Sequence, residues 1–308
     1  IGFLCYVALN MRLPLVPLHA ASMGITTAQI GLINAAYYLV ACLMSLPLAF
    51  FSNAFGSKTT VCAGLAILSI SSIALCLADH YLQFAAIYAC LGFGLAAFLP
   101  TMMSLVATIS PLSHLGRSYG WFTTAQNLGS GLGPAVGALL ARHIGFGRTF
   151  LVMGVSVFLT CCCALFSIPK NPAVEHRRSS PSLHGIGELF RNRRLTIGFT
   201  ATFIDCFALG MFTTFFPLHA KAMQLQLDQI GWIFLSQGLI NAVSRIPLGK
   251  VSDGIADRKE LVVKGSFVIA LSMAGFGLST SFAAFLVSAL VFGVGMACAF
   301  TAIGALIA

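Results

Sequence analysis

Long apolar segments alternate with short polar ones along the whole chain. In the segments 61–78, 150–168 and 261–278, apolar residues fill nearly every position, so they lack the polar face that a soluble amphipathic helix shows every 3.6 residues. Each segment is close to the roughly 20 residues that a helix needs to cross a bilayer. The pattern predicts ten spans, near residues 2–20, 28–51, 59–78, 82–107, 118–142, 148–168, 195–218, 228–250, 261–279 and 283–308.

The composition also indicates a polytopic membrane protein. Of the 308 residues, 58% are hydrophobic and 8% are charged, whereas a soluble domain carries about 25% charged residues. The mean hydropathy is +0.94. Because ten spans exclude a lone signal peptide, we expect a multi-pass membrane protein. We expect it in the inner (cell) membrane, as a monomer.

The basic residues indicate how the chain is oriented. Twelve of the 17 lysines and arginines lie in or beside the loops that follow even-numbered spans, and three lie in loops that follow odd-numbered spans. Basic loops remain in the cytoplasm, so the loops after even-numbered spans are predicted to be cytoplasmic. The net charge of +9 is thus spread over membrane loops, and we expect no nucleic-acid partner.

The longest polar interruption, residues 169–194, is rich in proline, serine and arginine and is predicted to be a cytoplasmic linker. Within it, residues 183–190 place four apolar side chains on one helical face, as in a short helix that lies on the inner membrane surface. A disordered linker fits equally well, because Gly185 and Gly187 weaken a helix.

The chain contains an internal repeat. PLHAASMGITTAQIG, from Pro17 to Gly31, returns as PLHAKAMQLQLDQIG, from Pro217 to Gly231. Ungapped alignment of residues 16–58 with 216–258 gives thirteen identities in 43 positions. The offset spans six helices, an even number, so both copies have the same orientation in the membrane.

Two parallel six-helix halves joined by a linker resemble the major facilitator superfamily. The resemblance implies an all-α membrane bundle of two such halves, with about ten spans present in this sequence. We assign the first half to residues 1–168, the linker to 169–194 and the second half to 195–308. Because the second half has four spans and the chain stops inside an apolar run, we expect a functional chain to continue for two more spans.

The loops after the second and eighth spans support this resemblance. In the superfamily this loop resembles G-x-x-x-D-R-x-G-R-K, and the second half here reads GKVSDGIADRK. In the second half Gly249 and Asp253 match, and Arg258 and Lys259 supply the basic cluster. The first half keeps Gly56 and Lys58 but has Asn53 in place of the aspartate. We interpret both loops as a cytoplasmic gate in which glycine permits close helix approach, and we expect the uncharged first copy to be weaker. A solvated loop with helix caps is the alternative.

The fifth span contains GWFTTAQNLGSGLGPAVGA. Its spacing closely resembles the antiporter motif of drug:proton exporters, although the motif's last glycine is alanine here. The motif residues are Gly120, Gly129, Gly133, Pro134 and Gly137. Glycines four residues apart permit close packing on one helix face, and an internal proline bends a helix. An ordinary packing seam fits the same residues, but the full spacing favours export over uptake.

The fourth span departs from the family. It keeps the Gly92-x-Gly94 of the proton-relay motif, but Tyr88 stands where that motif has an arginine. Proton coupling through that arginine is therefore excluded for this sequence.

Three charged residues lie within the predicted spans, where burial costs about 2.5–3.5 kcal/mol or more. Arg245 lies near the inner end, beside the gate, and is expected to extend to the interface. Arg12 is expected in the outer third of its span, extending outward. Asp205 follows Arg194 by eleven residues, about 16 Å along a helix, so we expect it at the midplane, facing a central cavity or protonated. A carboxyl group bonded to a neighbouring helix is the alternative.

Asp205 and Arg12 are therefore the leading candidates for coupling or substrate binding. Other residues able to line the same cavity are polar or aromatic, and each serves equally well in packing; they are Gln126, Asn127, Gln237, Asn241, Tyr37, Tyr38 and Tyr88. The repeated His19 and His219 are expected to fix the outer helix ends by bonding nearby polar groups, with pH sensing as the alternative.

We expect a secondary transporter that exports small amphipathic or cationic compounds in exchange for protons by alternating access. An uptake symporter or facilitator for a metabolite is the first alternative, and a membrane receptor without transport is the second. The chain lacks H-E-x-x-H, G-x-S-x-G and a P-loop, so we predict no enzymatic activity. No cysteine spacing is typical of a metal site, and no cofactor is expected. The expected partners are a small-molecule substrate, protons and the lipid bilayer.

Overall fold

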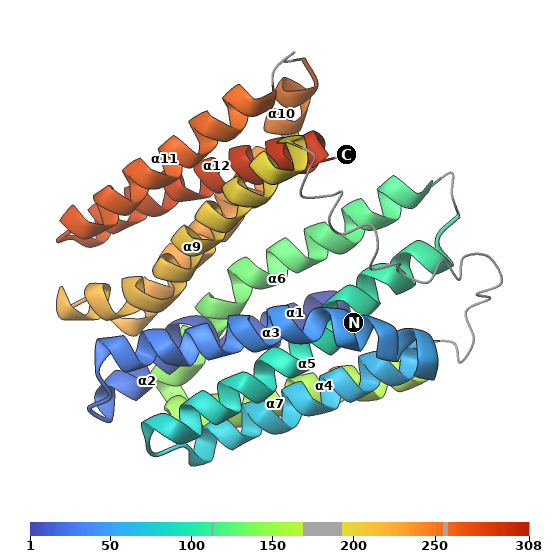
Figure 1. Ribbon diagram of the computed structural model, residues 1–308. Helices are drawn as coiled ribbons and strands as arrows, with labels where there is room; N and C mark the ends of the chain where they lie inside the picture. The colour runs from blue at the N-terminus through green and yellow to red at the C-terminus, as the bar shows by residue number, and fades with distance from the viewer. Residues whose placement is uncertain (112–113, 169–192, 255–257, 308) are drawn as a thin grey trace. The chain divides into compact units, whose positions relative to one another are not determined.

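Figure 1 shows the computed structural model, which describes residues 1–111, 114–168, 193–254 and 258–307. Every regular element within these ranges is helical. The chain divides into two compact units, Ile1–Val174 and Glu175–Ala308. The predicted surface helix at 183–190 lies outside the described residues.

Helices occupy all ten predicted spans. The first unit contains α1 (Gly2–Asn10), α2 (Arg12–Ser22), α3 (Thr27–Phe55), α4 (Ser57–Ala74), the short 3-10 helix η1 (Leu75–Leu77), α5 (Tyr81–Ile109), α6 (Leu115–Ile144) and α7 (Phe146–Ser167). The second unit contains α9 (Arg193–Ala222), α10 (Leu227–Gly254), α11 (Arg258–Leu278) and α12 (Phe282–Ile307). The first predicted span comprises α1 and α2, and the third comprises α4 and η1.

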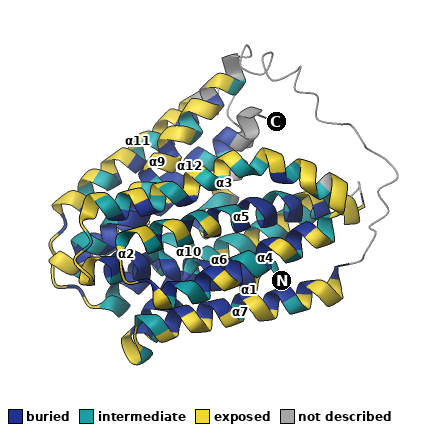
Figure 2. Ribbon diagram, turned by 60° about the horizontal axis from the view of Figure 1, so that its bottom comes forward, coloured by how far each residue is buried: buried dark blue, intermediate teal, exposed yellow. Residues whose placement is uncertain are grey.

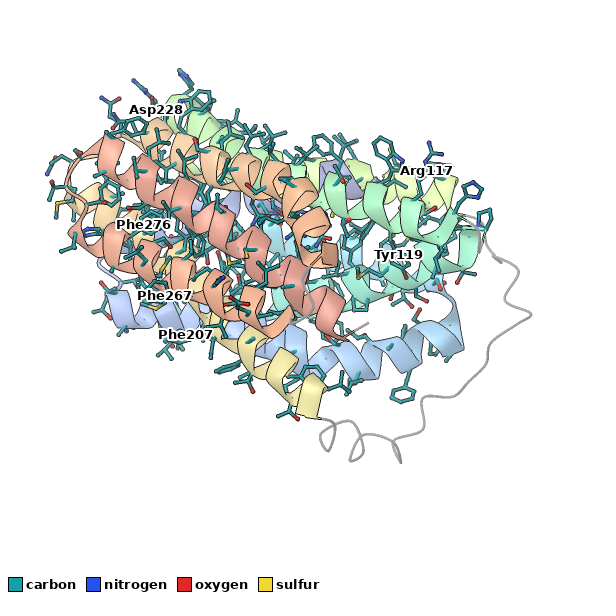
Figure 3. All side chains as sticks on the ribbon, turned by 90° about the horizontal axis from the view of Figure 1, so that it is seen from above. Arg117, Tyr119, Phe207, Asp228, Phe267 and Phe276 are labelled. Atoms are coloured by element: carbon teal, nitrogen blue, oxygen red, sulfur yellow. The ribbon has the colours of Figure 1, made fainter. Side chains whose placement is uncertain are left out.

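Eight spans within the described residues are long and apolar enough to cross a membrane, by length and composition. The other two long helices, α6 and α10, have 30 and 28 residues but are not among these eight. The α6 helix carries the glycine-rich motif, and α10 carries the polar series of the eighth span. Buried residues face neighbouring helices within each unit, and exposed stripes run along the outer faces (Figure 2). On these faces Phe207 and Phe267, labelled in Figure 3, are 64% and 69% exposed. An apolar exposed surface of this kind is expected where lipid is the solvent.

The repeated sequence builds the same turn in both units. Between α2 and α3 the chain passes through Gly24, whose φ is +79°, and the Gln29 side chain accepts a backbone N–H at 3.0 Å. Between α9 and α10 the equivalent Gln224 has a φ of +65°, and Gln229 accepts the corresponding N–H at 2.8 Å. The two glutamines are therefore identical for a local reason, since each satisfies an N–H group at a helix start.

The units also repeat their helix contacts, through glycines at equivalent positions. A Cβ built on Gly64 of α4 would lie 3.0 Å from the backbone nitrogen of Phe98 in α5. A Cβ built on Gly265 of α11 would lie 2.7 Å from the backbone nitrogen of Ala299 in α12. Small residues allow such close approach in membrane bundles, so α4 packs on α5 as α11 packs on α12.

The interiors of the two units differ in chemistry. In the second unit, the ring of Phe212 lies with its centroid 4.8–5.2 Å from those of four other phenylalanines, namely Phe216, Phe234, Phe276 and Phe292. In the first unit the residue equivalent to Phe212 is Arg12, which is also buried. A cation thus occupies the first unit at the position where the second has the centre of an aromatic cluster.

Candidate functional site

Arg12 lies between two tyrosines of the first unit. Its guanidinium carbon is 4.0 Å from the ring centroid of Tyr37 in α3 and 5.2 Å from that of Tyr88 in α5. The residue is 5% exposed. Arg12 therefore does not extend outward in the way that the sequence allowed, because cation-π contacts hold its side chain among the helices.

Arg12 lies within the apolar segment Gly2–Ser22 and precedes its end by ten residues, or about 15 Å at 1.5 Å per residue. Its depth in the membrane stays a prediction.

The local sequence interrupts the helix next to Arg12. The break falls at Met11, whose N–H is shared between two carbonyl groups at 3.3 Å. Pro14 and Pro17 follow, and neither has an N–H to bond the carbonyl one turn earlier. The two segments α1 and α2 thus meet at the residue that precedes the buried cation.

Two of the three candidate tyrosines contact the buried cation. Tyr37 and Tyr88 are 5% and 1% exposed, and their ring centroids lie 6.0 Å apart. They hold the cation of Arg12 and do not present a free stacking surface. Tyr38 does present one, because it is 45% exposed, and its ring centroid lies 4.9 Å from that of Tyr37.

The glycine-rich motif packs α6 onto the first membrane span. Cβ atoms built on Gly129, Gly133 and Gly137 would lie 2.6–2.7 Å from atoms of successive turns of the facing span, between Tyr6 and Met11. Pro134 is buried within the same seam. Gly120 differs from the other motif glycines, because nothing lies within 4 Å of a Cβ built on it. Three glycines of the motif therefore form the seam, and Gly120 lies outside it.

A polar contact accompanies this seam. The Asn10 Nδ2 group donates to the Tyr6 carbonyl at 2.7 Å and to Ser130 Oγ of α6 at 3.4 Å. Gln126 and Asn127, the two cavity candidates of α6, are half-buried about one turn before Ser130. Asn10 and Ser130 were not predicted from the sequence, although an asparagine inside an apolar span was a usable signal.

Asp205 joins two helices of the second unit. It is 0% exposed, and its Oδ1 accepts a hydrogen bond at 2.9 Å from Ser266 Oγ of α11. Its Oδ2 has no hydrogen-bond partner among the described residues. This is the neighbouring-helix arrangement that the sequence left open. Asp205 lies within the apolar span Gly198–Ala222, and its place at the midplane stays a prediction.

The polar series of α10 forms a bond along one face. Arg245 is half-buried, and its Nε donates to Asn241 Oδ1 at 3.0 Å. Arg245 was expected to extend toward the inner interface, but this bond points one turn back along the helix. The carbonyl of Gln237 lies 2.7 Å from a Cβ built on Gly293 of α12, so this part of the series lies in a helix contact.

The predicted gate is only partly described. Asn53 lies in the last turn of α3 and Asp253 in the last turn of α10. The structure does not describe the side chains of Asn53, Asp253 and Arg258, nor the surroundings of the gate residue Gly249. Lys58 is half-buried in the first turn of α4.

Gly56 is required by a turn and not by a close contact. It has φ of +90° and ψ of 146° between α3 and α4, a conformation that other residues adopt at a cost. Nothing lies within 4 Å of a Cβ built on it. The interpretation that this glycine permits close helix approach was therefore wrong.

The two repeated histidines contact aromatic rings. The ring centroid of His19 lies 5.1–5.9 Å from those of Phe84, Phe146 and Phe150. That of His219 lies 5.5 Å from the Phe285 ring. One nitrogen of each ring, His19 Nδ1 and His219 Nε2, is buried without a hydrogen-bond partner among the described residues. These two nitrogens do not form the expected polar bonds, and the role of the histidines at the helix ends stays a prediction.

Known proteins similar to this chain are membrane transporters. A sequence model described as the Major Facilitator Superfamily matches residues 1–308. An MFS-type transporter of Methanocaldococcus jannaschii is 24% identical over 296 residues, which cover 94% of this chain and 75% of the relative. The multidrug resistance protein MdtG of Proteus mirabilis is 24% identical over 281 residues, covering 88% and 69%. The quinolone resistance protein NorA of Staphylococcus aureus is 24% identical over 140 residues, covering 46% and 36%.

Solved structures share the fold at low sequence identity. A D-xylose-proton symporter matches with a TM-score of 0.76 and 16% identity, over 97% of this chain and 78% of its own. A bacterial homologue of the human lysosomal transporter Spinster, inward-facing and unoccupied, matches with a TM-score of 0.75 and 14% identity, over 99% and 76%. With the family match along the whole chain, this multi-pass membrane protein belongs to the major facilitator superfamily of transporters.

Proposed function

We propose that this protein exports small amphipathic or cationic compounds across an inner membrane in exchange for protons, by alternating access. The observation that carries the proposal is the seam of α6, in which three glycines of the antiporter spacing meet the facing span at 2.6–2.7 Å from built Cβ atoms. Two relatives, MdtG and NorA, are named as multidrug and quinolone resistance proteins, which supports drug efflux.

Proton-coupled uptake is the second candidate. The structural neighbours include a D-xylose-proton symporter and the nucleoside transporter NupG. Tyr88 replaces the arginine of the relay motif of drug:proton exporters. This departure from the exporter pattern is compatible with uptake.

Within the export proposal, Asp205 carries the coupled proton. Its carboxyl group is fully buried, and only one of its two oxygens has a hydrogen-bond partner in the described structure. A buried charge with so few partners is costly. Proton gain and loss at this group therefore alter the free energy of packing α9 against α11, which is how a proton drives a conformational step.

Transport in inside-out membrane vesicles tests the proposal. The lumen is acidified by respiration, and uptake is followed for the fluorescent cation ethidium together with neutral and anionic amphipathic dyes. An exporter accumulates its substrate in the lumen, and a protonophore abolishes the accumulation. A facilitator equilibrates the dye with or without the protonophore, and a receptor moves none; either result contradicts the proposal.

The gate makes a separate prediction. Asp253→Asn should slow transport more than Asn53→Ala, because only the second loop carries the charge. The gate hypothesis gives the Asp253 carboxylate a charge-assisted hydrogen bond in the closed state, and a loss of about 1.5–3 kcal/mol corresponds to roughly tenfold or more in rate. Initial transport rates are compared after normalisation to the amount of protein in the membrane. Parental transport by Asp253→Asn would show that the gate is assigned wrongly.

A further inference from the structure

The cation of Arg12 lacks an anionic partner. The residue is 5% exposed, and no carboxylate pairs with it in the part of the chain that the structure describes. Its Nε has no hydrogen-bond partner there either. A buried charge normally has a counter-charge or a full set of hydrogen bonds, so this site is incomplete as it stands.

The two tyrosines stabilise the cation, and a hydrogen bond to the Tyr88 side chain uses one part of its donor set, while Nε stays without a partner among the described residues. The rings of Tyr37 and Tyr88 lie 4.0 and 5.2 Å from the guanidinium carbon and interact with its π-system. The N–H donors of a guanidinium lie in its plane and point away from its faces, in a fork that matches a carboxylate. Stacking on aromatic rings and binding of an anion are therefore compatible at one arginine.

A second unpartnered polar group lies on the same membrane span. The Tyr6 hydroxyl is buried without a hydrogen-bond partner among the described residues, and Tyr6 is 6% exposed. The Tyr6 ring centroid lies 6.3 Å from that of Phe98 in α5, the helix that also carries Tyr88. Tyr6 and Arg12 therefore both face α5, and each has a group that can donate to an acceptor.

The position of Arg12 along its span bears on the source of the anion. Arg12 is ten residues, or about 15 Å, from the Ser22 end of its span. This distance favours an anion that belongs to a molecule entering the protein over a lipid headgroup at the membrane surface.

We infer that Arg12, with Tyr6 and Tyr37, forms an anion subsite that binds the carboxylate of a transported aromatic or amphipathic acid. The exposed ring of Tyr38 lies beside Tyr37 and offers a surface for the apolar body of such a compound. The second unit has no equivalent subsite, because Phe212 takes the place of the arginine. This inference rests on the proposed transport function. Within that proposal it favours amphipathic acids over the cationic compounds, because Arg12 repels a cation.

Equilibrium binding to the purified chain tests the subsite without requiring transport. The probes are radiolabelled 2-naphthoate, its methyl ester and 2-naphthylmethylammonium, which share one aromatic body and differ in charge. The protein is held in nanodiscs of neutral phosphatidylcholine. We expect 2-naphthoate to bind the parent protein at least about tenfold more tightly than the ammonium compound. Equal affinities, or the reverse order, would overturn the inference.

Arg12→Gln should lower 2-naphthoate affinity by at least about tenfold and leave ester affinity within about twofold, because a neutral amide cannot pair with a carboxylate. Arg148→Gln, at an exposed position at the start of α7, is the control and should change neither. Unchanged naphthoate binding by folded Arg12→Gln would overturn the inference. If that variant fails to fold, the affinity order of the parent protein decides.

Two further arms separate the remaining outcomes. Nanodiscs that contain anionic phosphatidylglycerol should leave naphthoate affinity unchanged, and competition by that lipid would assign the anion to a headgroup and overturn the inference. Binding needs no proton gradient. A charge preference without gradient-driven movement therefore contradicts the proposed export and leaves the subsite supported.

Discussion

Asp205→Asn is expected to abolish proton-driven transport while the protein remains folded. Asparagine retains an oxygen that accepts the hydrogen bond from Ser266 Oγ, which is 2.9 Å from Oδ1 in the parent, but it cannot bind or release a proton. Accumulation against a gradient is therefore lost, whereas substrate exchange down a gradient continues. The measurement is substrate accumulation in inside-out vesicles at an imposed pH gradient, normalised to membrane expression.

Ser266→Ala is the matched control for this variant. It removes the hydrogen bond, worth about 0.5–1.5 kcal/mol of stability, and leaves the carboxyl group in place. Proton-driven transport should therefore continue. Asp205→Glu should keep some transport with a shifted pH dependence, because the titratable group survives in a new position. Parental accumulation by Asp205→Asn would assign the carboxyl group to helix packing alone.

Alanine at Gly129, Gly133 and Gly137 together is expected to unfold the first unit. Each added Cβ meets the facing span at 2.6–2.7 Å, and overpacking costs about 1–3 kcal/mol per site. Three sites sum to about 3–9 kcal/mol, which is comparable with the whole stability of about 5–15 kcal/mol. Thermal unfolding of the purified protein in detergent measures the loss.

A second triple variant controls for the loss of glycine itself. Nothing lies within 4 Å of a Cβ built on Gly116, Gly120 or Gly147, which are all helical. Alanine at these three positions should leave the melting temperature unchanged or raise it, because alanine favours helix over glycine by about 1 kcal/mol. Equal destabilisation in both triple variants would mean that the seam between α6 and the first span is not the cause.

The helices were predictable from sequence because apolar length dominates in a membrane. A backbone in lipid must satisfy its own hydrogen bonds, so an apolar run of 20 residues has few structures open to it. The repeat around Gln29 and Gln229 was equally readable, since both residues serve a turn that lies within a few residues of them. The glycine spacing of α6 predicted a packing seam for the same reason, because residues four apart share one face.

Part of the repeat was missed because the spacing between equivalent residues changes by one along the chain. Equivalent residues are 200 positions apart in the first segment, but Gly64 and Gly265 are 201 apart. An ungapped alignment therefore loses the match after α10. The pair Gly92-x-Gly94 and Gly293-x-Gly295, visible with a one-residue shift, marks the same contacts in α5 and α12.

Side-chain partners could not be predicted from single helices. The sequence gives the place of Arg12 along its predicted helix. The direction of its side chain depends on Tyr37 and Tyr88, which belong to two other helices. In the same way, nothing near Asp205 in the sequence points to Ser266, 61 residues further along. Gly56 was misread because a packing glycine and a turn glycine look alike until φ is known.

The most direct test of exchange against protons uses the chain reconstituted in proteoliposomes that contain trapped pyranine, a pH-sensitive dye. The vesicles are loaded with a substrate identified in the inside-out vesicle assay and diluted into substrate-free buffer at equal pH. An antiporter brings protons in as substrate leaves, so we predict acidification of the lumen by the parent protein and none by Asp205→Asn. Substrate release with an unchanged lumen, or with alkalinisation as a symporter would produce, would contradict the account.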